Sequence, residues 1–314
     1  MKKFKVITAI ILVAIMSLSL WSCDLSNEVI DADAAQTNEA VSESTTAATE
    51  KPDGDTTTEA PEPPLVDSTL ENQAKTALAD DFNITVINDT TIDMTMYGSK
   101  TTTVSQSKQM INGSNIIQQT TENDGSNIEY TELIQIGSDF YITYEDSTHP
   151  ETTMLVKATD ADIKAAEEQL GAKDKEVLYS INDFMTVVRT ENADDSITYT
   201  CTGLRPSAEA KYNQLFCAAI AMISPGSSAK IDRDTMKYEV TFKDGKYVSC
   251  NIDMTLDAFL VFDGDSISVI YEYDIEETYT YGDVPEISAP TDFVADQTYT
   301  WEEYWALVQN SISG

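Results

Sequence analysis

Apolar residues follow three different patterns along this chain. A run from Val6 to Leu20 contains no charged side chain, and residues 24–64 show no periodicity at all. From residue 65 onward, segments with apolar residues at helical spacing alternate with segments in which every second residue is apolar. The second pattern predicts β-strands with one buried face. The folded part of the chain is therefore expected to begin near Leu65.

Two long hairpins are predicted in the last third of the chain. Apolar residues occupy even positions over 236–242 and 248–262, and odd positions over 267–281. Residues that pair directly across two strands lie on the same face, so the parity of the apolar positions predicts the length of each turn.

Parity makes a specific prediction for each hairpin. The first should have a three-residue turn, Lys243–Asp244–Gly245, which places Val240 opposite Val248. The second should have a two-residue turn, Asp263–Gly264, which places Leu260 opposite Ile267. Strands longer than 15 residues twist strongly, so the sheet should curl towards a half-barrel with one apolar and one charged face.

Shorter alternating runs predict further strands around residues 92–96, 101–111, 128–136, 140–144 and 197–202. The loops between the earlier strands are too short for a crossover helix, which indicates antiparallel neighbours.

Helices are marked by capping boxes, in which a Ser or Thr stands three residues before an acidic residue. Such pairs predict helix starts at Ser68, Thr159, Ser180 and Thr300, and the helix after Ser180 is expected to reach Val188. The last helix would carry two tryptophans and pack onto the domain.

The most apolar helix is predicted from Pro206 to Ile223, where residues 215–223 read LFCAAIAMI. A helix that is apolar all round must be covered on more than one side. One side should pack on the sheet, and the other should face either the helix after Ser180 or an apolar ligand. The candidate cavity residues are Leu215, Phe216, Ala219, Ile220, Ile223, Ile252, Met254 and Tyr271.

The N-terminus has the pattern of a secretory signal. Lys2, Lys3 and Lys5 precede the apolar run, which is too short to span a bilayer. The run ends in LWSC, which resembles the bacterial lipobox, and the resemblance implies that Cys23 is lipidated after cleavage. The predicted location is the extracytoplasmic face of the cell membrane, with the membrane as a partner through the lipid anchor.

Residues 24–64 hold 11 acidic residues, one basic residue and no aromatic residue. Such a segment cannot bury enough apolar surface to fold, which indicates a disordered linker. The predicted organisation is therefore a signal peptide (1–22), an anchor and linker (23–64), a folded domain (65–294) and a C-terminal amphipathic helix (295–314).

Composition and motifs exclude several functions. A net charge of −35 argues against a nucleic-acid partner, because phosphates are bound by clustered Lys and Arg. The single histidine, His149, excludes most zinc sites and His-dependent catalysis. No nucleophile elbow, phosphate loop or dinucleotide motif occurs, so we expect no catalytic residues, no metal, no cofactor and no enzyme activity.

Three cysteines remain beyond Cys23, namely Cys201, Cys217 and Cys250. At most one disulfide could form among them, and their apolar settings favour three buried thiols.

The order of elements, together with the terminal sequence YGDVPEISAP at 281–290, resembles the LolA-like lipoproteins, which include the mycobacterial lipid-binding lipoproteins. The resemblance implies a curved antiparallel half-barrel whose concave apolar face is covered by helices around a lipid-sized cavity. The expected class is α+β, and the expected function is non-catalytic binding of a lipid or another apolar ligand. The alternative is a structural or adhesive surface protein with a filled core and an external partner.

Overall fold

The computed structural model describes residues 62–81, 83–148, 154–159, 161–162, 179–223, 226–262, 265–290 and 298–303. The predicted signal peptide, the lipidation site Cys23, the linker up to residue 61, His149 and the body of the C-terminal helix lie outside these residues. None of the described helices is long and apolar enough to cross a membrane.

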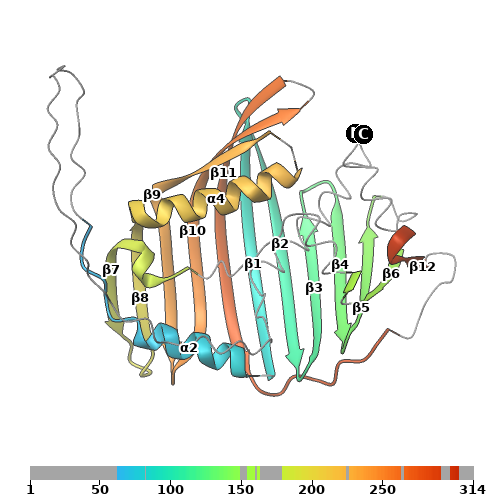
Figure 1. The fold of residues 1–314 in the computed structure, drawn as a ribbon, viewed down its shortest axis with the longest axis horizontal. Helices are drawn as coiled ribbons and strands as arrows, with labels where there is room; N and C mark the ends of the chain where they lie inside the picture. Colours follow the sequence, from blue (N-terminus) through green and yellow to red (C-terminus); the bar gives the residue numbers. More distant parts are fainter. Residues whose placement is uncertain are drawn as a thin grey trace, which may run out of the picture.

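Twelve strands form one sheet in the order β12-β6-β5-β4-β3-β2-β1-β11-β10-β9-β8-β7 (Figure 1). All neighbouring strands are antiparallel except β12 and β6, which run parallel. The strands are β1 (Asn83–Met96), β2 (Ser99–Asn112), β3 (Asn115–Asn123), β4 (Ile128–Ile136), β5 (Asp139–Asp146), β6 (Met154–Thr159), β7 (Phe184–Glu191), β8 (Ile197–Leu204), β9 (Ser228–Lys243), β10 (Lys246–Phe262), β11 (Asp265–Tyr281) and β12 (Thr298–Thr300).

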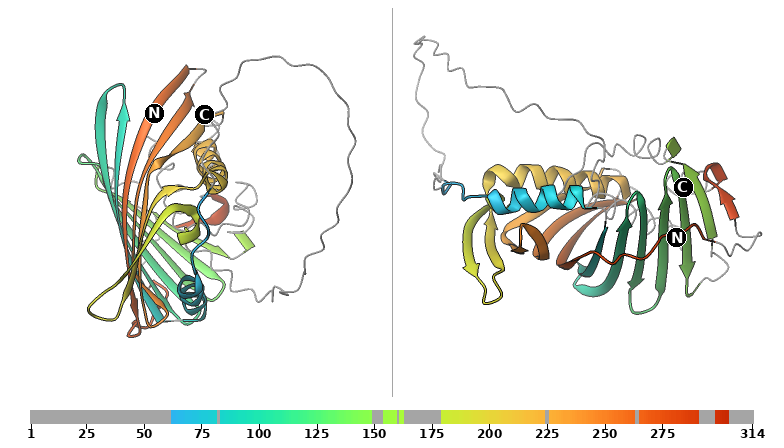
Figure 2. Two further views of the ribbon diagram at one scale, coloured as in Figure 1. Left: turned by 90° about the vertical axis from the view of Figure 1, so that its left-hand side faces the viewer. Right: turned by 90° about the horizontal axis from the view of Figure 1, so that it is seen from below.

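Two helices, α2 (Thr69–Asp80) and α4 (Pro206–Ile223), lie on one face of the sheet, which we call the inner face. They cross the strands near opposite ends, over the half of the sheet that contains β8–β11 (Figures 1 and 2). Helix α4 packs mainly on β9 and α2 mainly on β10. The largest core lies between these helices and strands β8–β11.

The predicted fold class is wrong in two respects. The protein is mostly β, because a single twelve-stranded sheet dominates the described residues, whereas an α+β half-barrel was expected. The sheet is curved but not closed, and the helices do not cover a concave face. The helices bury apolar strand residues at one half of the sheet, since only that half carries a continuous apolar inner face.

The turn between β9 and β10 also differs from the prediction. Lys243 pairs with Lys246, so the turn has two residues, and Asp244 and Gly245 both have positive φ (53° and 72°), as in a type I′ turn. The parity of the faces is restored by a β-bulge at Val248, after which Val240 pairs with Cys250.

The second hairpin has the predicted register. Leu260 pairs with Ile267, and Phe262 pairs with Asp265, which leaves a two-residue connection. The parity of the apolar positions therefore predicts the strand register correctly in the hairpin that has no bulge.

The helix predicted from Ser180 to Val188 is wrong. The Ser180–Asp183 capping box is present, but it caps a single 3-10 turn, η2 (Ile181–Asp183), and the chain continues as strand β7. By contrast, Ser68 makes no side-chain cap at the start of α2. Its expected partner Glu71 is only 1% exposed and accepts hydrogen bonds from Ser180 and the Ile181 amide instead.

The chain enters the domain along a fixed path. Arg205 is 4% exposed, and its guanidinium donates to the carbonyl oxygens of Phe184, Pro63 and Pro64. Glu62 accepts hydrogen bonds from the amide and hydroxyl of Ser207 at the start of α4, both at 2.9 Å.

The segment 282–290, which carried the family resemblance, runs along one end of the sheet after β11 (Figure 1). Val284 and Ile287 are buried. The Asn112 amide donates to the carbonyl oxygens of Val284 and Pro285, and Asn115 donates to that of Ile287. The segment therefore ties the end of β11 to the β2–β3 turn.

Candidate functional site

The structure describes the side chains of only some of the predicted cavity residues, and these lie in the main core or against it. Ile220, Ile252 and Met254 are buried in the main core, and Phe216 and Tyr271 are half-buried against it. The side chains of Leu215, Ala219 and Ile223 lie outside the described part of the chain.

Aromatic side chains fill the space between the two helices. Tyr179 stacks on Tyr212 from α4 with ring centroids 5.1 Å apart and also contacts Tyr238 from β9. Phe184 also stacks on Tyr238, with ring centroids 5.6 Å apart. The Tyr212 hydroxyl donates to Asp183, so the polar tip of this buried ring has a partner. At this place the predicted ligand space is occupied by the protein's own side chains.

A different group of apolar side chains is only half-buried. It lies on the inner face next to the main core, where β1, β11 and β10 pair. Met94 pairs with Tyr271, and Leu260 pairs with Ile267, so these residues lie side by side across three neighbouring strands. We call Met94, Met96, Leu260, Ile267 and Tyr271 the apolar patch.

Beyond the apolar patch, the inner face becomes polar at β2. Thr101 pairs with Met94 and Ser99 with Met96, so the methionine side chains are followed directly by hydroxyl groups. The inner positions further along β2 and β3 carry Ser107, Gln109, Gln118 and Thr120.

Three carboxylates stand in one row on the inner face of β3, β4 and β5. Glu122 pairs with Glu129, and Glu129 pairs with Asp146, so each is directly opposite the next. Burial raises the pKa of Glu122 to about 7, with a further contribution from the charge of Glu129. Burial also raises the pKa of Glu129, and the charge of Asp146 adds to that shift. We call Glu122, Glu129 and Asp146 the carboxylate row.

A fourth inner-face carboxylate, Glu277 on β11, has a structural role. It is 7% exposed and accepts hydrogen bonds from Asn88 at 3.0 Å and from the Tyr279 hydroxyl at 2.7 Å. Burial raises its pKa, and these two hydrogen bonds oppose that shift. Glu277 therefore has partners within the protein and needs no ligand.

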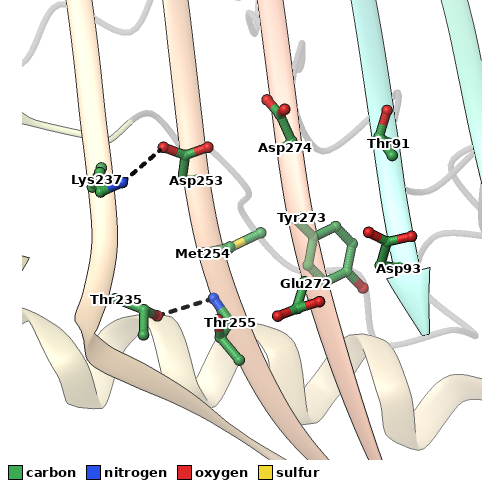
Figure 3. A pocket seen from close by; sticks show the side chains of 10 residues that line it. All are labelled: Thr91, Asp93, Thr235, Lys237, Asp253, Met254, Thr255, Glu272, Tyr273 and Asp274. Carbon is green, nitrogen blue, oxygen red and sulfur yellow. Dashed lines mark hydrogen bonds and ion pairs between the residues drawn. The ribbon is translucent and has the colours of Figure 1, made fainter. Parts of the chain in front are cut away.

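The opposite, outer face carries a shallow trough of about 340 Å³ beside a kink in β9 (Figure 3). Asp253 and Asp274 pair directly across β10 and β11, and Lys237 approaches Asp253 at 3.6 Å. The kink arises because Lys237 pairs with Asp253 while Asp232 pairs with Thr255. The lining residues are Thr91, Asp93, Thr235, Lys237, Asp253, Met254, Thr255, Glu272, Tyr273 and Asp274. Because the trough is open and its carboxylates are solvated, it does not define a site for a specific ligand.

Neither metal binding nor a disulfide is found among the described residues. No group of three or more metal-ligating side chains could hold an ion there. Cys201, Cys217 and Cys250 are free thiols; Cys201 and Cys250 are buried as predicted, whereas Cys217 is only half-buried, and burial raises the pKa of Cys201 to about 12. The Cys217 thiol donates to the Ala229 carbonyl and fixes α4 to the start of β9.

Comparisons with known proteins give little support for a family. No protein-family model matches the sequence, and no curated protein matches it. A crystal structure of a DUF1329 family protein from Desulfovibrio piger matches over 68% of this chain and 91% of its own, with 8% sequence identity and a TM-score of 0.22. A TM-score this low carries no argument. The curved sheet is compatible with a half-barrel, and the LolA-like resemblance is not confirmed.

Sequence reasoning placed Tyr271 next to a ligand but missed the other members of the apolar patch and the whole carboxylate row. Met94 was identified as a strand residue only. The carboxylates of the row are 24 positions apart or less in sequence, yet only strand pairing shows that they face one another. The signal that could have predicted the carboxylate row is an acidic residue at an inner-face position in each of three consecutive strands.

Proposed function

We propose that this protein is a lipid-anchored extracytoplasmic lipoprotein that binds an apolar ligand, without catalysis, on the apolar patch. The anchor rests on the lipobox resemblance at Cys23. The single observation that supports ligand binding is that Met94, Met96, Leu260, Ile267 and Tyr271 are only half-buried, whereas the core beside them buries the inner-face residues of β10 from Cys250 to Ala258. Flexible methionine side chains adapt to irregular apolar ligands.

The adhesive alternative is favoured by a different observation. The aromatic side chains between α2 and α4 are packed as a filled core, and the outer face carries a hydrophilic trough. A surface protein that binds an external partner would need a rigid core and an accessible outer face.

Ligand uptake by the mature chain, residues 23–314 with Cys23→Ser, distinguishes the two functions. We expect native mass spectrometry to detect co-purified lipid and a fluorescent diacylglycerol analogue to bind saturably. Met94→Gln should weaken binding about tenfold, which corresponds to about 1.4 kcal/mol of lost apolar contact.

Val104→Gln is the matched control, because Val104 is an exposed apolar residue on the outer face of β2 and should leave binding unchanged. If the folded mature chain carries no lipid and does not bind the analogue, the binding function is wrong and the adhesive alternative is favoured.

A further inference from the structure

The two edges of the sheet end in strands of very different length. At one edge, β12 pairs with β6 over only three residues, Thr298–Thr300. At the other edge, β7 is eight residues long and pairs with β8 (Figure 1). A very short edge strand is one of the ways in which proteins prevent another chain from pairing with a sheet. That protection is present at β12 and absent at β7.

The free edge of β7 runs from Met185 to Glu191. Phe184 does not belong to it, because its side chain is buried and its carbonyl accepts a hydrogen bond from Arg205 at 2.9 Å. Among the described residues, no strand pairs with the second edge of β7, so the N–H and C=O groups of alternate residues point away from the sheet. This edge contains neither proline nor lysine, and Val188 is 54% exposed. It can therefore accept a further strand.

The charges near this edge allow a second copy of the chain to approach. Two copies that each carry a net charge of −35 repel each other over most of their surface. Strand β11, for example, has five acidic residues and no basic residue. By contrast, β7 has one arginine and one glutamate, β8 has no charged residue, and β9 has four basic and three acidic residues. The three strands at this edge therefore add no net negative charge.

The sequence of β7 is complementary to itself in one register. Residues that lie directly opposite each other in antiparallel strands share a face of the sheet. When two β7 strands pair about Val188, all residues from Met185 to Glu191 have a partner, because Val188 is the midpoint of this segment. On the outer face, Val188 then lies beside its own copy and Thr186 lies beside Thr190. No two like charges oppose each other in this register.

The other symmetric registers are less favourable. A centre at Arg189 would place two guanidinium groups opposite each other, and like charges at opposed positions destabilise a sheet. A centre at Val187 would pair only residues 185–189, and a centre at Thr190 only residues 189–191. The register about Val188 therefore combines the longest pairing with the absence of charge repulsion.

We propose that the free edge of β7 is a self-association surface, on which the β7 strands of two copies pair antiparallel about a two-fold axis at Val188. The two sheets then form one continuous sheet, with both inner faces on the same side. This interface is separate from the proposed ligand site, because the apolar patch lies on β1, β10 and β11.

Sedimentation equilibrium of the mature chain (Cys23→Ser) tests this interface. We expect a reversible monomer–dimer equilibrium with a dissociation constant below about 1 mM, since small interfaces are weak. Val188→Asp and Val188→Lys should each raise that constant at least fivefold, because each places two like charges opposite each other at the axis. An equimolar mixture of the two variants should form heterodimers with a dissociation constant within twofold of the wild-type value, because Asp then faces Lys.

Val104→Asp is the matched control, because Val104 is an exposed valine on the outer face of β2 and the substitution adds the same charge away from the edge. It should leave dimerisation unchanged. A wild-type chain that stays monomeric over the whole concentration series would overturn the proposal. Dimerisation of Val188→Asp at wild-type strength, an equal loss in Val104→Asp, or the absence of heterodimers in the mixture would also overturn it.

Discussion

Individual residues in this protein are placed where sequence signals alone would not put them. Glu71 has the spacing of a capping residue, yet it is buried and holds the 3-10 turn at Ser180. Arg205 is buried and binds three backbone carbonyls, so it fixes the entering chain rather than a ligand. In both cases the partner lies more than 20 residues away in sequence, beyond the reach of a local motif.

Glu122 should make the protein less stable as the pH rises. Its pKa is about 7 in the folded state, against 4.5 as the ordinary value, so the native state binds a proton that the unfolded state releases between these pH values. Stability therefore falls with increasing pH over this range and levels off above it. The shift corresponds to about 3 kcal/mol at most.

Glu122→Gln removes this titration. We expect the variant to exceed the wild type in free energy of unfolding by up to about 3 kcal/mol at pH 8 and to differ little at pH 4, as measured by urea unfolding. Glu145→Gln on the outer face provides the comparison. A gain of the same size at both pH values would show that Glu122 is not the titrating group.

At the scale of elements, the strands with one buried face could be predicted from the sequence, whereas the turns and bulges that connect them could not all be predicted. The hairpin of β10 and β11 has the register that parity predicts, because its inner-face positions are apolar at every second residue and no bulge interrupts the pairing. In the hairpin of β9 and β10, a type I′ turn combines with a bulge at Val248, which leaves the same alternation in the sequence. A bulge shifts the phase of the alternation by one residue, here between the buried Tyr247 and Cys250, and this shift lies so close to the turn that the even positions beyond it look uninterrupted.

The type I′ turn can be tested at Gly245. Its φ is +72°, and an added Cβ would only meet Gln73 at 3.7 Å or more, so the cost is backbone strain rather than a clash. We expect Gly245→Ala to lower the free energy of unfolding by about 1 kcal/mol. Asp244→Asn should be neutral, because Asn also tolerates positive φ. Unchanged stability of Gly245→Ala in urea unfolding would contradict this turn type.

At the scale of the whole molecule, one open sheet carries two different surfaces on its inner face. Strand β1 pairs with β11, about 180 residues later in the chain, and this pairing joins the N-terminal meander to the C-terminal hairpins. The segment 282–290 then crosses to the β2–β3 turn. The contacts of segment 282–290 therefore hold together strands that are far apart in sequence. We expect them to contribute to the free energy of unfolding of the whole sheet.

Ile287→Ala should therefore destabilise the whole domain. Ile287 is 7% exposed, and truncating a buried isoleucine costs about 2–4 kcal/mol. Glu286→Ala, at the exposed neighbouring position, should change the free energy of unfolding by less than about 0.5 kcal/mol. Thermal and urea unfolding would check both. Equal stability of the two variants would mean that the segment is peripheral to the fold.

The sequence by itself determined the elements whose signal is local. Helix α4 is continuous and apolar, the long strands alternate, and the register of β10 with β11 follows from that alternation. These features depend on residues close together in the chain, so propensity and periodicity are enough to predict them.

Tertiary structure alone decided which surface each element presents and to which neighbour. The residues after Ser180 became strand β7 because a strand pairs there with β8, although a capping box precedes them. In β4, the alternating Ile134 and Ile136 lie on the outer face, while Glu129 points to the inner face beside two further carboxylates. Strand pairing fixes these faces through backbone hydrogen bonds between distant segments, which no local pattern in the sequence records.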